Sequence, residues 1–382
     1  MANKTARLGD LATYINGYAF KPADWGDTGL PIIRIQDLTG NSYQLNRYDG
    51  EYPERIEVND GDVLISWSAS LGVYVWQRGK ALLNQHIFKV VFDKLPVNKE
   101  YFVFAVEHKL AEMESKTHGA TMKHIVKKDF DGTTIPYPPI EKQAEIADHL
   151  RRITSLIDRQ AEQLLLLDQL VKSRFIELFG DPKQNPKGYP VKEFDEISVL
   201  ITDGEHATPR RTDKGIYLLS ARNILNHALQ LDDVDYIDEE EYIRIARRVV
   251  PQAGDVLISC SGSIGRCCVV PEELRFQMVR SAALIRFDDT IKPIFAEWLI
   301  SSDELQRQIS MSATQSSQAN LFQGEIRKLR GYVPPLELQE QFAAFVEQTD
   351  KSKYYSSLSF RYCQAAANTY RQEWMTCRTS DF

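Results

Sequence analysis

One six-residue segment occurs twice in this chain without a substitution: Gly61–Ser66, with the sequence GDVLIS, returns as Gly254–Ser259. Two further pairs of segments are similar and keep the same order: Gly29–Ile33 with Gly215–Leu219, and Pro138–Gln143 with Pro334–Gln339. The repeat therefore covers about half of the chain, far more than one unit of a solenoid. It predicts two related halves with the same order of elements.

Each half is predicted to begin with buried strands and to continue into an amphipathic helix. Short apolar runs predict the strands: Ile32–Ile35, Val63–Ile65 and Ile87–Phe92 in the first half, and Tyr217–Leu219, Val256–Ile258 and Ala282–Phe287 in the second. Apolar residues at helical spacing predict one helix through Phe102–Met113 and another through Phe295–Ile309. The predicted fold class is therefore α+β, with two duplicated mixed α/β domains.

The first Pro-Pro pair is followed by a stretch without Pro or Gly, which predicts a helix over Glu141–Phe179. Ten positions along it alternate in spacing between four and three residues, which is typical of a coiled-coil seam. Eight of the ten are apolar: Ile146, Leu150, Ile153, Ile157, Leu164, Leu167, Val171 and Leu178. The other two, Gln160 and Arg174, either set the register of a partner helix or lie where the two helices diverge.

A second stretch without Pro or Gly, Leu336–Phe382, predicts another long helix, whose last residues near Thr379 we expect to fray. Its apolar seam is weaker and begins with Phe342 and Phe345. The predicted domains are globular units at residues 1–138 and 190–333 and long helices at residues 139–180 and 335–377. We expect the two helices to pair antiparallel and to hold the globular units apart.

The formal net charge is −7, and it divides unevenly along the chain. Residues 1–190 contain 24 Lys+Arg and 25 Asp+Glu, so the net charge is −1 there and −6 in the remainder. An acidic chain is poorly suited to non-specific nucleic-acid binding through bulk charge. Any DNA contact must therefore come from local basic loops.

Cysteine usage and hydropathy indicate the compartment. The five cysteines have no metal-ligand spacing, which predicts free thiols in a reducing cytoplasm. Residues Met1–Gly17 lack the apolar segment of a secretory signal, and the densest apolar run, Leu164–Leu167, is far too short to cross a membrane. We therefore expect a cytoplasmic protein with no membrane contact and no bound metal.

Taken together, these segments resemble the specificity subunit of type I restriction–modification enzymes over essentially the whole chain. The resemblance depends on the doubled GDVLIS segment with its Ser/Gly loop, on Asn84–Ile87, on the two Pro-Pro helix starts and on Phe175–Pro182. It implies two target-recognition domains, each of which reads one half of a bipartite site in double-stranded DNA. It also implies a pair of spacer helices between these domains.

The same resemblance implies the partners. Two methyltransferase (modification) subunits dock on the spacer helices in this family, and restriction/translocase subunits join that core. It implies that the specificity subunit has no active site and binds no cofactor. S-adenosylmethionine, ATP and magnesium are expected on the partner subunits.

Candidate DNA contacts combine short polar side chains, positive charge and aromatic rings, which suit phosphates and base edges. In the first half they are Trp67, Ser68, Ser70, Asn84, Gln85, His86, His118, Thr121, Lys123 and His124. In the second half they are His206, Thr208, Arg210, Arg211, Ser261, Ser263, Arg266, Arg280, Thr314, Gln315, Ser316 and Gln318. The second half has Gln277–Ser281 where the first has Asn84–His86, a difference expected of domains that read different half-sites.

Each candidate stretch also has a purely structural interpretation. The serines of the loop around Trp67 either line a groove beside an exposed indole or close a tight turn by bonding to their own backbone. The basic window Lys116–Lys128 and the polar segment Thr314–Asn320 are equally typical of solvated loops. Residues Asn84–His86 suit a structural turn as well as they suit base contact.

No catalytic site is predicted. Asp93 with Glu107 and Lys109 fits a loose nuclease pattern, but the latter two fall on a predicted amphipathic helix, where charges on the solvent face are ordinary. The chain has no Gly-rich cofactor turn, no base-gripping Pro-Pro motif of a methyltransferase and no Walker-type phosphate loop. The alternative function is a duplicated coiled-coil scaffold that binds only proteins, which the acidic charge fits slightly better.

Overall fold

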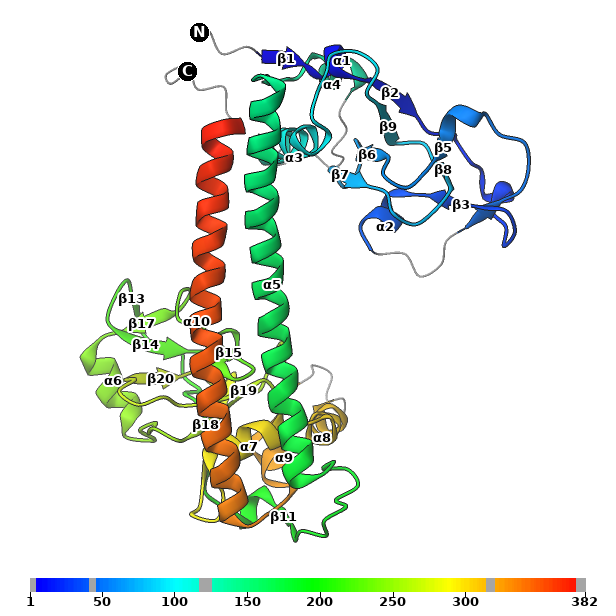
Figure 1. Ribbon diagram of the computed structural model, residues 1–382. Helices are drawn as coiled ribbons and strands as arrows, with labels where there is room; N and C mark the ends of the chain where they lie inside the picture. Colours follow the sequence, from blue (N-terminus) through cyan, green and yellow to red (C-terminus); the bar gives the residue numbers. More distant parts are fainter. Residues whose placement is uncertain (1–4, 41–45, 117–125, 314–319, 376–382) are drawn as a thin grey trace. The chain divides into compact units, whose positions relative to one another are not determined.

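The computed structural model describes residues 5–40, 46–116, 126–313 and 320–375 (Figure 1). The chain forms two compact units, the first made of residues 1–161 with 357–382 and the second of residues 162–356. Both units contain helices and strands, in agreement with the predicted mixed class. None of the described helices combines the length and the hydropathy that a membrane-spanning segment needs.

The first unit contains a four-stranded antiparallel sheet and a second sheet of shorter strands. The antiparallel sheet has the order β2 (Thr13–Asn16), β9 (Ile87–Val91), β6 (Val63–Ser66) and β7 (Gly72–Val75). The second sheet has the order β4 (Arg47–Tyr48), β3 (Leu30–Ile33), β8 (Ala81–Leu83) and β5 (Glu57–Val58), with β3 parallel to β8. The other elements are the pair β1 (Thr5–Arg7) and β10 (Thr134–Pro136), the helices α1 (Leu8–Leu11), α2 (Ile35–Leu38), α3 (Lys99–Lys116) and α4 (Lys127–Gly132), and 3-10 turns at Pro22–Asp24 and Glu54–Ile56.

The second unit contains two four-stranded sheets that use the same kinds of pairing. The antiparallel sheet has the order β12 (Ser198–Asp203), β21 (Ala282–Phe287), β18 (Val256–Ser259) and β19 (Cys267–Val269). The other has the order β13 (Arg211–Thr212), β17 (Asp235–Ile237), β14 (Ile216–Leu219) and β20 (Phe276–Met278), with β14 parallel to β20. The other elements are the pairs β11 (Val191–Glu193) with β22 (Arg330–Tyr332) and β15 (Ile224–Leu225) with β16 (Ala228–Leu229), the helices α6 (Glu239–Ala246), α7 (Pro293–Ile300), α8 (Asp303–Ala313) and α9 (Gln323–Arg327), and 3-10 turns at Phe194–Glu196 and Ala221–Asn223.

The apolar part of each GDVLIS segment is a completely buried strand, β6 in the first unit and β18 in the second. Alternate side chains of a strand point to opposite faces of the sheet. Val63 and Ile65 accordingly belong to one apolar cluster, whereas Leu64 belongs to another. The equivalent strand of the second unit divides its residues in the same way. Burial on both faces explains why the sequence is continuously apolar instead of alternating.

The first two residues of the GDVLIS segment fix the turn that leads into this strand. The two glycines have φ angles of 89° and 87°, a region in which a side chain is strained. Asp62 accepts a hydrogen bond from the backbone N–H of Asn59 (2.9 Å), and Asp255 accepts one from that of Gln252 (2.7 Å). Asp62 also pairs with Lys89 of β9 (3.1 Å), and Asp255 pairs with Arg286 of β21 (2.7 Å).

The Pro-Pro motif is repeated because its glutamine is buried and bonds to the same backbone groups in both places. Gln143 accepts a hydrogen bond from the N–H of the residue before α3 (2.9 Å) and donates one to the carbonyl of Pro138 (2.8 Å). Gln339 accepts one from the N–H before α7 (2.8 Å) and donates one to Pro334 (2.8 Å). Both side chains thereby anchor the start of a long helix to its own unit.

The two long helices are α5 (Ile140–Phe179) and α10 (Leu336–Met375), each of 40 residues. The first was expected at Glu141–Phe179, so that prediction is confirmed to within one residue. In the first unit His149 of α5 contacts the hydroxyl of Tyr370 of α10 (2.9 Å), and in the second Asp168 contacts Lys353 (2.8 Å). The start of α5 therefore meets the end of α10 in the first unit, and the end of α5 meets the start of α10 in the second, as Figure 1 shows.

Two expected elements differ from the structure. The single helix expected through Phe295–Ile309 is wrong, because α7 ends and α8 begins on either side of Ser302. The Ser302 hydroxyl donates to the carbonyl of Leu299 (2.6 Å), which supplies a local partner for a helix end without any Pro or Gly. In the first half Ile35 begins α2 instead of ending a strand.

We predict that Gln339→Ala and Gln143→Ala each lower the free energy of unfolding by about 2 kcal/mol, because each leaves buried backbone groups without a partner. The matched control is Gln341→Ala, whose side chain is exposed on the same helix as Gln339. It should change the free energy by less than about 0.5 kcal/mol. Denaturant unfolding followed by circular dichroism measures both, and equal stability of the Gln339 and Gln341 variants would contradict the assigned role.

Candidate nucleic-acid interface

The loop after β6 is closed by the last serine of the GDVLIS segment. Ser66 is fully buried, and its hydroxyl donates to the carbonyl of Ser70 (2.6 Å). The backbone N–H of Trp67 donates to the carbonyl of His86 (3.3 Å), which ties this loop to the segment before β9. The hydroxyls of Ser68 and Ser70 make no hydrogen bond with the described part of the chain. The turn is therefore closed by one serine, and the other two hydroxyls stay available.

The loop after β18 has the same construction. Ser259 is fully buried; its hydroxyl donates to the carbonyl of Ser263 (2.6 Å) and accepts from the N–H of Arg266 (2.9 Å). The N–H of Cys260 donates to the carbonyl of Ser281 (2.8 Å). Burial raises the pKa of the Cys260 thiol to about 12, so this thiol stays protonated. Cys260 thus takes the place that the tryptophan has in the first unit.

The expectation of an exposed indole at Trp67 is wrong. Its ring is half-buried and stacks on Phe88, with ring centroids 5.4 Å apart and planes inclined by 22°. It also meets His86 edge to face at 5.0 Å. The ring therefore forms part of the apolar core beneath the loop. A direct DNA contact by Trp67 stays a prediction.

Local hydrogen bonds hold the segment before β9, and the side chain of Gln85 takes no part in them. The N–H of Gln85 donates to the side-chain oxygen of Asn84 and to the carbonyl of Tyr18, each at 2.9 Å. His86 has a φ of 71° and is half-buried. A Cβ at Gly17 would lie 1.9 Å from the Asn84 carbonyl oxygen, so this approach of two backbones requires glycine. Asn84 and His86 therefore shape the turn, and the Gln85 side chain is exposed.

The segment before β21 repeats this arrangement in the second unit. The N–H of Arg280 donates to the carbonyl of Glu205 (3.0 Å). A Cβ at Gly204 would lie 2.4 Å from the carbonyl oxygen of Val279, so the same close approach occurs here. Arg280 is exposed, and its guanidinium makes no ion pair with the described residues. Arg280 is therefore the structural counterpart of Gln85.

Arg210 and Arg211 lie in a surface network of ion pairs. Arg210 contacts Asp238 (3.1 Å) and Glu240 (2.8 Å), and Arg211 contacts Asp235 (3.0 Å). The hydrogen bonds to Glu240 and then Asp238 raise the pKa of Arg210 above its usual range. A DNA contact by either arginine must compete with a carboxylate, and it stays a prediction.

The other predicted contacts of this region differ in their surroundings. His206 contacts Asp203 (2.7 Å), which also bonds to Arg248. Thr208 is exposed. Arg266 is half-buried, and its guanidinium makes no ion pair within the described ranges. Arg266 and Arg280 are thus the predicted cations of the second unit that lack a carboxylate partner there.

Eight predicted DNA contacts lie outside the described residues: His118, Thr121, Lys123, His124, Thr314, Gln315, Ser316 and Gln318. The chain re-enters the described part beside the serine loop of the second unit. Asn320 forms a β-bridge with Ser261, and the N–H of Leu321 donates to the carbonyl of Cys260 (2.9 Å). The polar segment expected to read DNA therefore joins the fold next to Ser261.

The predicted helix-pairing residues are all buried or half-buried. The buried ones are Ile146, Leu150, Val171, Leu178 and Phe342, and the half-buried ones are Ile153, Ile157, Leu164, Leu167 and Phe345. In the second unit the rings of Phe175 and Phe342 meet at 5.4 Å. Phe175 lies beside the predicted seam, so the contact between the helices is wider than the line of residues that the spacing defines.

Sequence reasoning missed a second set of apolar residues on the same helices. These side chains are exposed: Leu156, Leu165, Leu166, Leu170 and Ile176 on α5, and Tyr354, Tyr355, Leu358 and Tyr362 on α10. The sequence contains the signal for this surface. In a pair of helices only the seam is covered, so apolar residues outside the seam are expected to be exposed.

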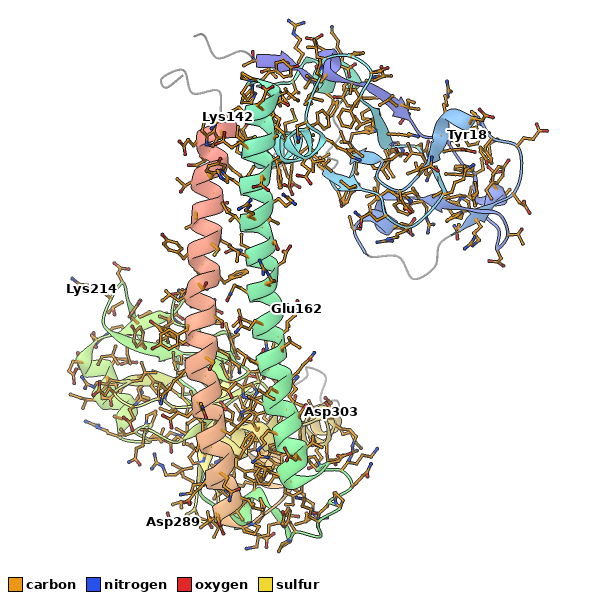
Figure 2. The ribbon with its side chains drawn as sticks, in the orientation of Figure 1. Tyr18, Lys142, Glu162, Lys214, Asp289 and Asp303 are labelled. Carbon is orange, nitrogen blue, oxygen red and sulfur yellow. The ribbon has the colours of Figure 1, made fainter. Side chains whose placement is uncertain are left out.

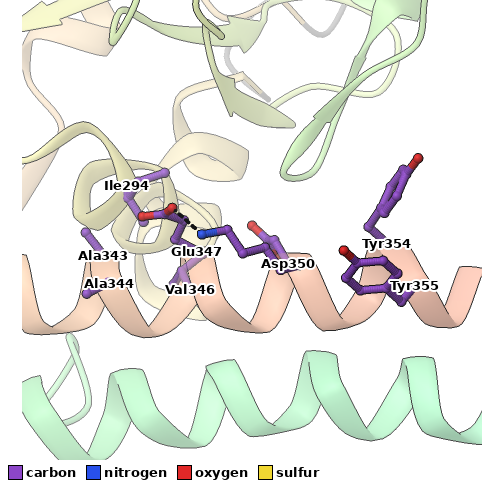
Figure 3. Close-up of a pocket in the computed structure, with 9 residues that line it drawn as sticks. Ile294, Ala343, Ala344, Val346, Glu347, Asp350, Tyr354 and Tyr355 are labelled. Atoms are coloured by element: carbon purple, nitrogen blue, oxygen red, sulfur yellow. Dashed lines mark hydrogen bonds and ion pairs between the residues drawn. The ribbon is translucent and has the colours of Figure 1, made fainter.

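Tyr354 and Tyr355 lie at one end of a groove of about 610 Å³ along α10 in the second unit (Figure 3). Ile294 of α7 contributes an apolar wall. The ion pair between Glu347 and Lys351 (2.8 Å) lies along it, and this bond lowers the pKa of Glu347. The groove therefore combines apolar walls with one charged pair and the carboxylate of Asp350.

The residues that fit a loose nuclease pattern serve structural contacts. Asp93 accepts a hydrogen bond from the N–H of Thr13 (3.0 Å). Glu107 pairs with Arg371 of α10 (3.5 Å), and Lys109 with a glutamate one turn further along α3 (2.9 Å). Across the described ranges, no group of three or more His, Cys, Asp or Glu side chains is placed to hold a metal ion.

Residues 2–166 match the family model described as the type I restriction modification DNA specificity domain. This domain and the relatives aligned along most of the chain define the class of protein that the chain resembles: the DNA specificity subunits of type I restriction–modification systems. It is 26% identical over 372 residues to the type I restriction enzyme EcoBI specificity subunit of Escherichia coli, which covers 89% of this chain and 78% of that relative. The resemblance stated from the sequence is thereby confirmed.

Solved structures share the fold. The crystal structure of the type I restriction-modification system S subunit from M. genitalium matches with a TM-score of 0.64 and 13% identity, over 98% of this chain and 96% of that one. A chain solved in work on complex assembly and conformational transition of the type I R-M system matches with a TM-score of 0.58 and 16% identity, over 98% of both chains. The type I restriction enzyme MjaVIII specificity subunit of Methanocaldococcus jannaschii is a further relative, 22% identical over 369 residues, which cover 91% of this chain and 86% of that relative.

We predict that Arg266→Ala weakens DNA binding about equally for all sequences and lowers the slope of log K against log salt by about 1, as expected when one phosphate contact is lost. The matched control is Lys214→Ala, labelled in Figure 2, which removes an exposed cation from the turn before β14. Titration of labelled duplex at several salt concentrations measures both slopes. An unchanged slope for Arg266→Ala would contradict the phosphate contact.

Proposed function

We propose that this chain reads a bipartite target in double-stranded DNA for a type I restriction–modification complex. One observation carries the proposal: the two units hold their loops with the same buried bonds but present different exposed side chains. Ser66 and Ser259 close the two loops in the same way, whereas Gln85 and Arg280 occupy equivalent exposed positions. A protein that reads two unlike half-sites needs this combination of a common scaffold and different contacts.

The proposal includes a domain arrangement. Two duplicated target-recognition domains occupy residues 1–138 and 190–333, and spacer helices at 139–180 and 335–377 pair as an antiparallel coiled coil. The helix contacts within each unit support this arrangement, since the start of one helix meets the end of the other. The repeated strand order of the two antiparallel sheets supports the duplication.

The proposal also includes partners. Two methyltransferase subunits dock on the spacer helices, restriction/translocase subunits join this core, and S-adenosylmethionine, ATP and magnesium bind to those partners. The exposed leucines and tyrosines of α5 and α10 support docking there, because contiguous apolar surface usually marks an interface. We expect the complex to act on DNA in the cytoplasm.

A protein-binding scaffold without DNA specificity is the second candidate. The net charge of −7 and the ion-paired state of Arg210 and Arg211 favour it. Electrophoretic mobility shift of the chain with its methyltransferase partner separates the two functions. Salt-sensitive, sequence-selective binding supports the recognition subunit, and indifference to DNA supports the scaffold.

We predict that a heptad inserted into α5 within Ile146–Leu178, matched by one in the paired part of α10, lengthens the gap between the half-sites. Seven helical residues add roughly 10 Å, or about three base pairs at ~3.4 Å each. Methylome sequencing of a host that carries the variant complex measures gap and half-sites together. Altered half-sites, or an unchanged gap, would contradict the spacer role.

A further inference from the structure

We propose that Gln85 and Arg280 are the matched base-reading positions of the two units, with Gln85 specific for an adenine and Arg280 for a guanine in the major groove. This inference rests on the proposed function and deepens it by assigning one base of each half-site to one side chain.

Strand register fixes the equivalence of the two positions. Ser66 of β6 lies opposite Ile87 of β9 in the first unit, and Ser259 of β18 lies opposite Ala282 of β21 in the second. The residue two positions before Ile87 and the residue two positions before Ala282 therefore occupy the same place relative to the buried central strand. These residues are a glutamine and an arginine.

Equivalent backbone hydrogen bonds anchor the two positions. The N–H of Gln85 donates to the carbonyl of Tyr18 (2.9 Å), and the N–H of Arg280 donates to that of Glu205 (3.0 Å). In both units the accepting residue follows the glycine that allows the two backbones to approach. A side chain projected from this site is thus carried on a rigid backbone, as base readout requires.

Both side chains are available. Gln85 and Arg280 are exposed, and neither side chain bonds to the described part of the chain. The nearby carboxylate of Glu205 is already engaged, because it accepts from the N–H of Ala207 (3.0 Å) and lies 3.6 Å from Arg244. Arg280 therefore differs from the ion-paired arginines of the same unit.

The residue types at these two positions favour base reading over phosphate binding. Phosphates are alike in both half-sites, so a position that anchors the backbone should carry a cation in both units. This position carries a neutral amide in one unit and a guanidinium in the other. Those are the two groups that pair bidentately with adenine and with guanine, respectively.

The test exchanges the two side chains in the intact complex. Gln85→Arg and Arg280→Gln variants, each with the methyltransferase subunits, methylate a random-sequence DNA library, and the methylated sites are read by sequencing. Arg280→Gln should convert one guanine of one half-site to adenine, and Gln85→Arg one adenine of the other half-site to guanine. Each exchange should shift the preference at that base by roughly 5- to 150-fold and leave the opposite half-site unchanged.

Alanine variants test the same proposal if a variant with an exchanged side chain gives an inactive complex. Arg280→Ala and Gln85→Ala should each make one base of one half-site degenerate, and binding to the same library by the complex measures this without methylation. An unchanged motif, changes in both half-sites, or equal weakening on every sequence would overturn the assignment. A wild-type complex that selects no bipartite motif would instead overturn the proposed function, so the two failures are distinguishable.

Discussion

The buried strand of the GDVLIS segment is the constraint on which each unit depends. Its apolar side chains join clusters on both faces of the sheet, so the polar residues at its ends are drawn into the interior with it. A buried hydroxyl without a partner costs about 1–3 kcal/mol. Ser66 and Ser259 avoid that penalty by bonding to the carbonyl four residues on, and the loop takes the shape which that bond requires. The core thereby determines where the exposed loop residues lie.

This division between scaffold and contact reconciles an acidic chain with a DNA-recognition role. Many cations of the second unit are occupied by carboxylates, as Arg210 and Arg211 are, and do not add to a general attraction for phosphates. Sequence information lies in the base edges and not in the backbone. A recognition subunit therefore needs a few well-placed free side chains more than it needs bulk positive charge, and partners that also contact DNA can contribute to the remaining affinity.

The sequence predicted elements whose signals are local. Helix α5 was expected within one residue of its observed bounds, because Pro-Pro, Gly180 and the seam spacing all lie in the segment itself. Contacts between distant residues were not predictable in this way. Trp67 looked exposed in a polar loop, but Phe88, 21 positions later, stacks against it. The ion pair of Arg210 with Asp238 likewise spans 28 positions, which no local pattern reports.

The long helices connect recognition with assembly. On α10 the pairing face includes small polar residues, and the hydroxyl of the buried Thr349 donates to the carbonyl of Phe345 (2.9 Å). Such a seam holds two helices together less strongly than an all-leucine seam would. At the same time Leu165 and Tyr355 are 64% and 69% exposed, so a pair of helices leaves apolar surface in water that a third body can cover. If partners dock there as proposed, their association adds to the stability of the helix pair. In the proposed complex, the helix pair fixes the distance between the reading loops. The subunits that act on the DNA therefore cover the apolar surface of the same element.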